Sequence, residues 1–309
     1  MIKERKGSFM DISFELYKVF YYVATTLSFS QASRQLYISQ SAVSQSIKSL
    51  EQKLGHPLFL RNTKKVALTP EGEALLRHVE PAVNLLYEGE NQLLNSPSVE
   101  APLRIGASDT ICRYFLVPYL NRFHREHAGV HIKVTNQTST RCVDLLESGQ
   151  VDLIVTNYPN SRLTDRTAAI PIHTFQDVFI ASREHYPELM DKTLTLKELL
   201  RHPILMLDRK STTSEFLHQL FQQHQLDLVP EIELGSNDLL VDLASIGLGI
   251  AFVPDYCLTR ASSLFKVRIT EELPARQLVI AHNAQLPVPQ AARAFIRFFT
   301  DAAGTGIHS

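Results

Sequence analysis

The sequence lacks tryptophan altogether, has only three cysteines and contains no long apolar run. An odd number of cysteines without a pairing pattern argues against a disulfide framework and indicates a reducing compartment. The apolar runs stay well below the roughly 20 residues that cross a bilayer. The charged first residues are not followed by the apolar stretch of a secretory signal. These absences predict a cytoplasmic protein with no membrane partner.

Net charge is also nearly absent, at −1 over 309 residues, but it is unevenly distributed. Residues 1–70 carry ten Lys and Arg against four Asp and Glu, whereas the rest of the chain carries 21 basic against 28 acidic residues. A chain of this length exceeds one ordinary core, so we expect two or three domains. A small basic head on a larger acidic body is typical of a nucleic-acid-binding module joined to a regulatory domain.

Three short helices are predicted within the first 55 residues. Helical spacing of apolar side chains marks the first helix, at Leu16, Phe20, Val23 and Leu27. A short second helix is expected to begin with Ser30 as its cap. After a tight turn, a third helix that ends at Gly55 would bury Val43, Ile47, Leu50 and Leu54. This order of elements predicts a helix-turn-helix unit.

The outward face of the third helix and the segment after it carry the side chains expected to contact DNA. Two short strands, 58–61 and 66–68, flank a polar and basic hairpin tip, which predicts a wing. For base edges the candidates are hydrogen-bonding side chains near the helix start, namely Ser39, Gln40, Ser41, Ser44 and Gln45. For phosphates the candidates are the basic side chains Arg34, Lys48, Arg61, Lys64 and Lys65. An isolated helix with such a face is more often a solvated surface, but the spacing of the whole unit favours DNA binding.

This N-terminal segment resembles the signature of LysR-type transcriptional regulators. The matching residues are Phe29–Ser33, Leu36, Ser39–Ser44, Ile47, Leu50, Glu51, Leu54, Gly55, Leu58, Phe59, Arg61 and Leu68–Gly72. Two positions depart from the family pattern, because Ser33 stands where a second alanine is common and Gln45 where an arginine is frequent. The resemblance implies an N-terminal all-α winged helix-turn-helix that binds double-stranded promoter or operator DNA.

Residues 70 to about 95 are predicted to form one long helix, starting at Thr69-Pro70-Glu71 and with Pro81 as a possible kink. Its apolar side chains are too many for a lone helix between two domains, so it should pair with another chain. The resemblance also implies a dimerisation helix at this place. We expect domain boundaries at 1–69 for the winged helix-turn-helix, 70–97 for the linker helix and hinge, and 98–309 for the remaining domain.

From Leu103 onward, short strand patterns alternate with helical patterns, which predicts an α/β architecture with largely parallel sheets. The resemblance continues more weakly, at Leu103–Ser108, Phe115–Pro118, Leu145–Leu153 and Gly247–Pro254. It implies a periplasmic-binding-protein-like effector domain of two subdomains with a cleft. We expect subdomain I at about 99–163 and 270–305, and subdomain II at about 164–269.

Ligands of such folds bind beyond the carboxyl ends of strands and at helix N-termini. The candidate effector-binding residues are therefore Ser108, Asp109, Thr110, Asn136, Gln137, Thr138, Asn157, Asp208, Ser211, Ser236, Asn237 and Val253. Hydroxyls and amides at these places suit a carboxylate or oxyanion. Asp109 is interpreted first as a helix N-cap. If it faces the cleft instead, it favours a cationic or amine-bearing effector.

Other chemistry is predicted less strongly. The sequence has no Gly-x-Ser-x-Gly elbow, P-loop or His-Glu-x-x-His pattern, so we expect no catalytic residues and no cofactor. His124, His127 and His131 are better explained as surface histidines than as a metal site. A thiol switch at Cys112 and Cys142 is an alternative, because each is expected near a helix start that stabilises a thiolate.

The sequence as a whole predicts a dimeric or tetrameric LysR-type regulator that senses a small molecule. Closure of the cleft around the effector would change the angle of the paired DNA-binding heads and the bend of the operator. The expected partners are DNA, the effector, a second copy of the chain and, for an activator, RNA polymerase. The alternatives are a thiol-based sensor or, from another class, a cytoplasmic solute-binding protein or enzyme.

Overall fold

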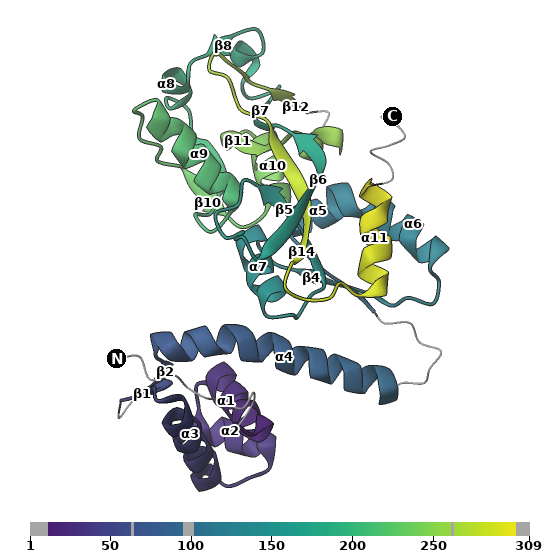
Figure 1. Ribbon diagram of the computed structural model, residues 1–309. Coiled ribbons are helices and arrows are strands. Elements are labelled where there is room, and N and C mark those ends of the chain that lie inside the picture. Colours follow the sequence, from purple (N-terminus) through teal and green to yellow (C-terminus); the bar gives the residue numbers. More distant parts are fainter. Residues whose placement is uncertain (1–11, 63–64, 95–101, 261–262, 301–309) are drawn as a thin grey trace, which may run out of the picture. The chain divides into compact units, whose positions relative to one another are not determined.

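The computed structural model describes residues 12–62, 65–94, 102–260 and 263–300 (Figure 1). The chain divides into two compact units, Met1–Ser96 with Glu147–Gln150, and Pro97–Leu146 with Val151–Ser309. The predicted hinge at 95–98 lies outside the described residues. Among the described residues, no helix combines the length and apolar character needed to cross a membrane.

The first unit contains three helices, a two-stranded hairpin and a long fourth helix. Their bounds are α1 Phe14–Thr26, α2 Phe29–Leu36, α3 Gln40–Leu54, β1 Phe59–Asn62, β2 Lys65–Leu68 and α4 Pro70–Leu94. The predicted stripes form the core at Phe20, Val23, Val43, Ile47 and Leu50, which are all fully buried. The inclusion of Leu27 was wrong, because Leu27 is the C-cap of α1 and is 48% exposed. The predicted cap of α2 was wrong by two residues. Ser28 is the N-cap, and its Oγ accepts a hydrogen bond from the Gln31 amide.

Helix α4 begins at a tight junction with the segment before the hairpin. The Thr69 hydroxyl accepts a hydrogen bond from the Gly72 amide and donates one to the Pro57 carbonyl. A Cβ on Gly72 would lie 2.2 Å from the Leu58 carbonyl oxygen, so only glycine fits here without a shift. Pro81 lies within α4, which is assigned as one helix from Pro70 to Leu94.

The second unit is built on two five-stranded sheets and one small two-stranded sheet. In order across the first sheet, the strands are β4 Ile132–Asn136, β3 Leu103–Ala107, β5 Leu153–Tyr158, β14 Arg276–Asn283 and β6 Thr167–Phe175. Across the second they are β10 Ile232–Leu234, β9 Ile204–Leu207, β11 Ile250–Pro254, β7 Asp177–Ser182 and β12 Leu264–Lys266. The small sheet pairs β13 Arg268–Ile269 with β8 Thr193–Leu194.

The helical elements of this unit follow the strands. They are α5 Asp109–Ile111, the π-helical turn η1 Cys112–Leu116, α6 Val117–Glu126, α7 Ser139–Glu147, η2 Pro187–Leu189, α8 Leu196–Leu199, α9 Thr212–Gln223, α10 Asn237–Ser245, η3 Asp255–Arg260 and α11 Gln290–Thr300. One predicted helix, 111–126, thus starts two residues earlier and is interrupted by a π-helical turn.

The sheets are mixed, and the expectation of largely parallel sheets was wrong. Strand β14 runs antiparallel to both of its neighbours, β5 and β6, and β7 runs antiparallel to β11 and β12. The cause is that the chain crosses directly from one sheet to the other between β6 and β7, and returns before β14. Strand β6 belongs to the first sheet, so the first sheet takes residues that we had assigned to the 164–269 subdomain.

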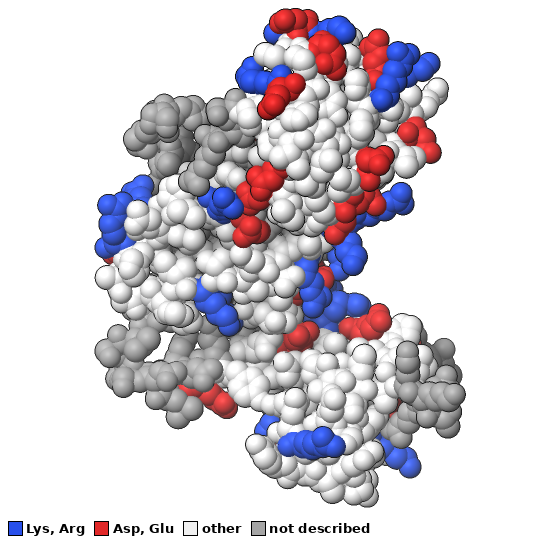
Figure 2. Space-filling model, turned by 180° about the vertical axis from the view of Figure 1, so that it is seen from behind, with Lys and Arg blue, Asp and Glu red and all other residues white. Residues whose placement is uncertain are grey.

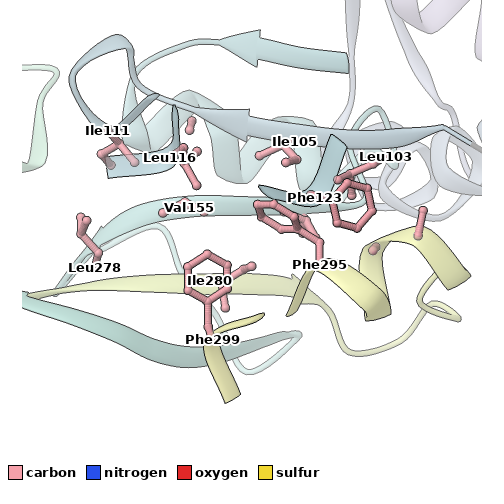
Figure 3. Packing of buried hydrophobic residues seen from close by; sticks show 14 of the residues in the cluster. Leu103, Ile105, Ile111, Leu116, Phe123, Val155, Leu278, Ile280, Phe295 and Phe299 are labelled. Carbon is pink, nitrogen blue, oxygen red and sulfur yellow. The ribbon is translucent and has the colours of Figure 1, made fainter. Parts of the chain in front are cut away.

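The core of the first sheet lies between its strands and the helices α6 and α11. Leu103, Ile105 and Val155 on the strands pack with Phe123 of α6 and Phe295 of α11 (Figure 3). All of these side chains are fully buried. Phe123 and Phe295 contact each other edge to face, with ring centroids 5.4 Å apart. This packing fixes the strand ends that carry the polar residues described next.

Candidate functional sites

Helix α3 presents the predicted DNA-contacting side chains on its surface. Gln40, Ser41, Gln45 and Lys48 are exposed, as are Arg34 of α2 and Ser39 before α3, and Ser44 is half-buried. Ser39 is the N-cap of α3, because its Oγ accepts a hydrogen bond from the Ala42 amide. It also shares a hydrogen bond of 2.9 Å with the Ser41 hydroxyl. The Ser39 hydroxyl is thus engaged in capping α3, whereas the other predicted polar side chains remain available to contact DNA.

The predicted wing is present as an antiparallel hairpin of β1 and β2, with Asn62 opposite Lys65. Lys64 lies outside the described residues, and so do the side chains of Arg61 and Lys65. In Figure 2 the visible face of the first unit is mostly uncharged and carries a few scattered charged side chains, whereas the part of the second unit built by β8 and α8 carries many charged side chains of both signs.

Helix α4 buries one side and exposes apolar residues on another. Val79 and Val83 are buried in the core of the first unit. Leu85, Leu86, Tyr87 and Leu93 are exposed, Leu93 by 87%. These four residues are called the apolar face of α4 below. Exposed apolar side chains of this kind on one helix are typical of an interface.

The second unit contains a cavity of about 250 Å³ to which both large sheets contribute. Residues at or directly after the carboxyl ends of β3, β4 and β5 line it from the first sheet, and residues at or directly after the ends of β9, β10 and β11 line it from the second. Eleven of the twelve predicted effector-binding residues are among its lining: Ser108, Asp109, Thr110, Asn136, Gln137, Thr138, Asn157, Asp208, Ser211, Ser236 and Asn237.

Val253 does not line the cavity. It is fully buried in the hydrophobic core behind β11, and Pro254 and Tyr256 line the cavity instead. The sequence could not distinguish these positions, because every residue of β11 is buried and no alternation marks the exposed side. The lining also includes residues that we did not predict, namely Ser139, Thr212, Thr213 and Gly235. Their position directly beside predicted residues was the available signal.

Serine hydroxyls begin three of the helices around the cavity. Ser108, Ser211 and Ser236 are the N-caps of α5, α9 and α10 and accept hydrogen bonds from backbone amides three residues later. Asp109 follows the cap, so its interpretation as an N-cap was wrong. Its Oδ1 accepts a hydrogen bond of 3.3 Å from the Asn136 side-chain amide, and its side chain is exposed on the cavity.

Side-chain hydrogen bonds connect the two halves of the cavity. The Asn157 amide donates to the Thr212 hydroxyl at 3.1 Å, and the Asn237 amide donates to the Thr110 hydroxyl at 3.0 Å. Beside the cavity, Asp238 of α10 accepts from the Tyr114 hydroxyl at 2.5 Å and from the Arg113 guanidinium at 3.1 Å. These contacts hold residues of the first sheet against the first turns of α9 and α10.

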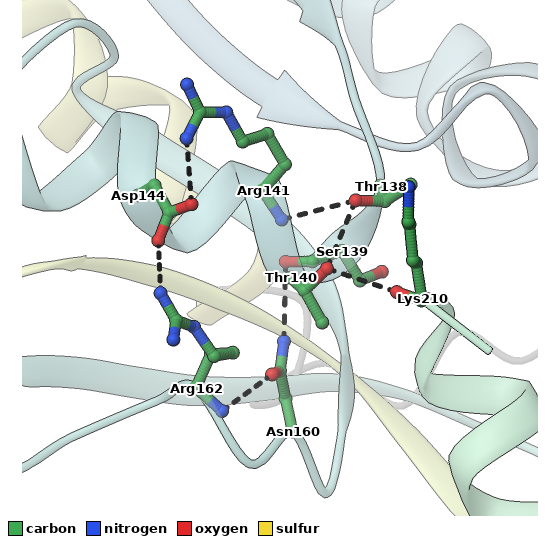
Figure 4. Close-up of polar contacts among 8 residues, drawn as sticks. All are labelled: Thr138, Ser139, Thr140, Arg141, Asp144, Asn160, Arg162 and Lys210. Atoms are coloured by element: carbon green, nitrogen blue, oxygen red, sulfur yellow. Dashed lines mark hydrogen bonds and ion pairs between the residues drawn. The ribbon is translucent and has the colours of Figure 1, made fainter. Parts of the chain in front are cut away.

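The first turn of α7 also borders the cavity, and Figure 4 shows its polar contacts. The Thr138 hydroxyl accepts a hydrogen bond from the Arg141 amide, and the Asn160 side chain donates to the Ser139 carbonyl. The Thr140 hydroxyl donates to the Lys210 carbonyl at 3.2 Å, which joins α7 to the loop before α9. Asp144 accepts from both Arg141 and Arg162 on the outer side of α7. Polar contacts therefore fix the start of α7.

The cysteines lie in surroundings that oppose thiolate formation. Burial raises the pKa of Cys112 to about 11 and that of Cys142 to about 12. The Cys112 Sγ lies 3.3 Å from the Asn136 Oδ1, and the Cys142 Sγ lies 3.6 Å from the Gln137 carbonyl. The expectation that a helix start lowers these pKa values was wrong, because desolvation outweighs the helix dipole. Within the described residues, no group of His, Cys, Asp or Glu is arranged to hold a metal ion.

Comparison with known families and proteins identifies relatives of this chain. Residues 14–73 match the family of bacterial regulatory helix-turn-helix proteins of the lysR type, and residues 98–304 match the LysR substrate binding domain. The chain is 28% identical over 246 residues to the transcriptional activator CmpR of Synechocystis sp., covering 78% of this chain and 79% of CmpR. It is 27% identical over 282 residues to the activator IlvY of Salmonella typhimurium, and the match covers 88% of this chain and 94% of IlvY.

Two solved structures share the fold. A full-length OxyR variant from Pseudomonas aeruginosa matches with a TM-score of 0.65 at 19% identity, covering 94% of this chain and 96% of that one. Full-length CbnR in complex with its target DNA matches with a TM-score of 0.62 at 17% identity, and the match covers 94% of this chain and 100% of the CbnR chain.

Proposed function

The chain belongs to the LysR family of bacterial transcriptional regulators, and from this premise we propose which residues bind DNA and which bind an effector. Helix α3 reads the operator, and the cavity between the two large sheets holds a small molecule that modulates regulation. The observation that carries the proposal is the convergence of eleven polar residues from the ends of five strands, β3, β4, β5, β9 and β10, on one cavity. A hydrophobic core does not gather so many polar side chains around an open cavity, whereas a ligand-binding site does.

In the DNA complex, Gln40, Ser41, Ser44 and Gln45 contact base edges, because they lie on the surface near the start of α3. Arg34, Lys48, Arg61, Lys64 and Lys65 contact phosphates. Ser39 contributes mainly by capping α3 and so by fixing its first turn. The phosphate contacts set affinity and salt dependence, and the base contacts set sequence preference.

The regulator acts as a dimer or a tetramer whose apolar faces of α4 are covered by a second copy. Two-fold pairing presents two recognition helices to successive major-groove faces of a pseudo-palindromic site. If the protein activates transcription, RNA polymerase is a further partner. Its DNA target places its action in the cytoplasm. The named relatives are regulators, and the proposal assigns this chain no catalytic step.

The effector acts by shifting a population of cavity conformations. The contacts of Asn157 with Thr212 and of Asn237 with Thr110 already join the two halves. A ligand that bridges the same strand ends stabilises the closed arrangement further, since it binds that state more tightly. The raised pKa values of Cys112 and Cys142 weigh against the alternative of a thiol sensor.

The test is selection of DNA sites from a random pool by the full chain, followed by affinity measurements on the enriched site. We expect enrichment of a site with two related halves, bound with strong salt dependence. Adding an effector to this complex should change the affinity or the bend of the DNA. Failure to enrich any site, with binding that is equal on random DNA, would contradict the proposal.

A further inference from the structure

We propose that the effector is a small molecule carrying an ammonium group, of the size of an amino acid. This inference rests on the proposed function, namely that the cavity holds the effector. The first argument is the charge of the lining. Asp109 and Asp208 are its only ionisable carboxylates, and no Lys, Arg or His is among the described residues that line it. The cavity therefore carries a formal charge of −2 that a cation offsets.

In the described structure these two carboxylates have no cationic partner, unlike some other carboxylates of this unit. Asp152 pairs with Arg104 at 2.5 Å and Asp238 with Arg113 at 3.1 Å. Within the described part of the chain, no Lys, Arg or His forms an ion pair with Asp109 or Asp208. From the described residues each carboxylate accepts a hydrogen bond from an uncharged donor, the Asn136 amide for Asp109 and the Lys210 backbone amide for Asp208.

The buried cation beneath the cavity is not available to neutralise them. Arg276 donates to the Thr213 hydroxyl, which lines the cavity, but its guanidinium is 1% exposed and lies 2.6 Å from Asp177. The charges of Arg276 and Asp177 offset each other. The negative charge of the lining therefore remains unbalanced within the described structure.

Two buried amide oxygens supply an independent argument. Asn157 and Asn237 line the cavity and are only 8% and 6% exposed. Their side-chain nitrogens donate to Thr212 and Thr110, but among the described residues neither Oδ1 has a hydrogen-bond partner. A buried acceptor without a donor is costly. A carboxylate ligand brings no donor for these oxygens, whereas an ammonium group brings three.

The remaining surface of the cavity accommodates the other end of such a ligand. The first turns of α7, α9 and α10 border the cavity, and helix N-termini favour an anionic group. An α-amino acid satisfies both requirements, because its ammonium group meets the carboxylates and amide oxygens while its carboxylate meets the helix starts. The selective element is the ammonium group.

The experiment compares matched probes by thermal unfolding of the full chain. The probes are the L-amino acids, the corresponding 2-hydroxy acids, which replace the ammonium group by a hydroxyl, and simple diamines without a carboxylate. We expect at least one amine-bearing probe to raise the Tm, and its hydroxy-acid counterpart to bind at least tenfold more weakly. Asp109→Asn and Asp208→Asn should each weaken binding of that probe at least tenfold.

The control variant is Asp191→Asn, which removes one exposed carboxylate outside the cavity and should leave probe affinity unchanged. A Tm of each unliganded variant near that of the parent chain establishes that it folds. The inference is overturned if amine-free acids bind as well as their amino counterparts, if both Asn variants bind the probe normally, or if no amine-bearing probe shifts the Tm. In each case selection of a specific DNA site still tests the proposed function separately.

Discussion

The guanidinium of Arg276 lies 2.6 Å from the carboxylate of Asp177, and neither side chain is more than 1% exposed. Asp177 begins β7 and Arg276 begins β14, so the pair joins the two places where the chain passes between the large sheets. The guanidinium also lies over the rings of Phe216 and Phe175, at 4.9 and 5.5 Å from their centroids. The two crossings are therefore held together at one buried point.

We expect Arg276→Met to destabilise the chain by about 3–5 kcal/mol, because it leaves a buried carboxylate without its partner. Adding Asp177→Asn should recover part of this loss. Urea unfolding followed by circular dichroism measures the free energy of unfolding of the single and the double variant. The control is Arg122→Met, which breaks an exposed pair with Glu126 and should cost less than about 1 kcal/mol. Equal effects of the two Arg changes would contradict this account.

Two glycines of α4 should respond oppositely to alanine. Gly72→Ala forces a Cβ to within 2.2 Å of the Leu58 carbonyl, and we expect a loss of about 1–3 kcal/mol from overpacking. Gly89→Ala meets nothing within 4 Å and should stabilise the helix by about 0.5–1 kcal/mol. Thermal unfolding of the two variants tests the pair. An unchanged stability of Gly72→Ala would contradict this prediction, because the backbone at Leu58 would then shift at no cost.

The division of labour on α3 predicts different DNA-binding defects. Lys48→Ala should weaken binding to all DNA and reduce the slope of log K against log salt by about 0.9, for one lost phosphate contact. Ser44→Ala should mainly alter sequence preference. Fluorescence anisotropy on specific and random duplexes at several salt concentrations distinguishes them. Equal losses on both duplexes for both variants would refute the division.

Mild peroxide should leave DNA binding unchanged. At neutral pH the thiols of Cys112 and Cys142 stay protonated, since burial raises the pKa of Cys112 to about 11 and that of Cys142 to about 12. The thiolate is the form that reacts. The readout is operator affinity before and after peroxide, with Cys112→Ser and Cys142→Ser in parallel. A loss of binding that a thiol reductant reverses, and that is absent in either variant, would restore the sensor hypothesis.

The same burial predicts a pH effect on stability. The pKa of Cys142 rises from 9.0 to about 12 on folding, so its contribution is fully present below pH 9 and is lost as the pH rises towards 12. Over this window the unfolded chain releases a proton that the native chain keeps. We expect Cys142→Ala to show a shallower fall of unfolding free energy, by up to about 1.4 kcal/mol per pH unit. Identical slopes for parent and variant would refute it.

The sequence alone determined the elements that depend on neighbouring residues. Helical spacing at Phe20, Val23, Val43 and Ile47 predicted α1 and α3, because burial of one helix face repeats every three to four residues. Polar residues directly after β3, β4, β9 and β10 predicted most of the cavity lining, since strand ends of such sheets gather at one edge. The family resemblance rested on the same local patterns.

Tertiary structure decided what depends on residues far apart in the chain. It assigned the cap of α5 to Ser108, which leaves Asp109 on the cavity, and it turned Val253 into the core. It paired Arg276 with Asp177, 99 positions away, and it buried Cys142 deeply enough to raise its pKa. Strand pairing, burial and desolvation are set by which distant segments pack together, and no local pattern encodes that choice.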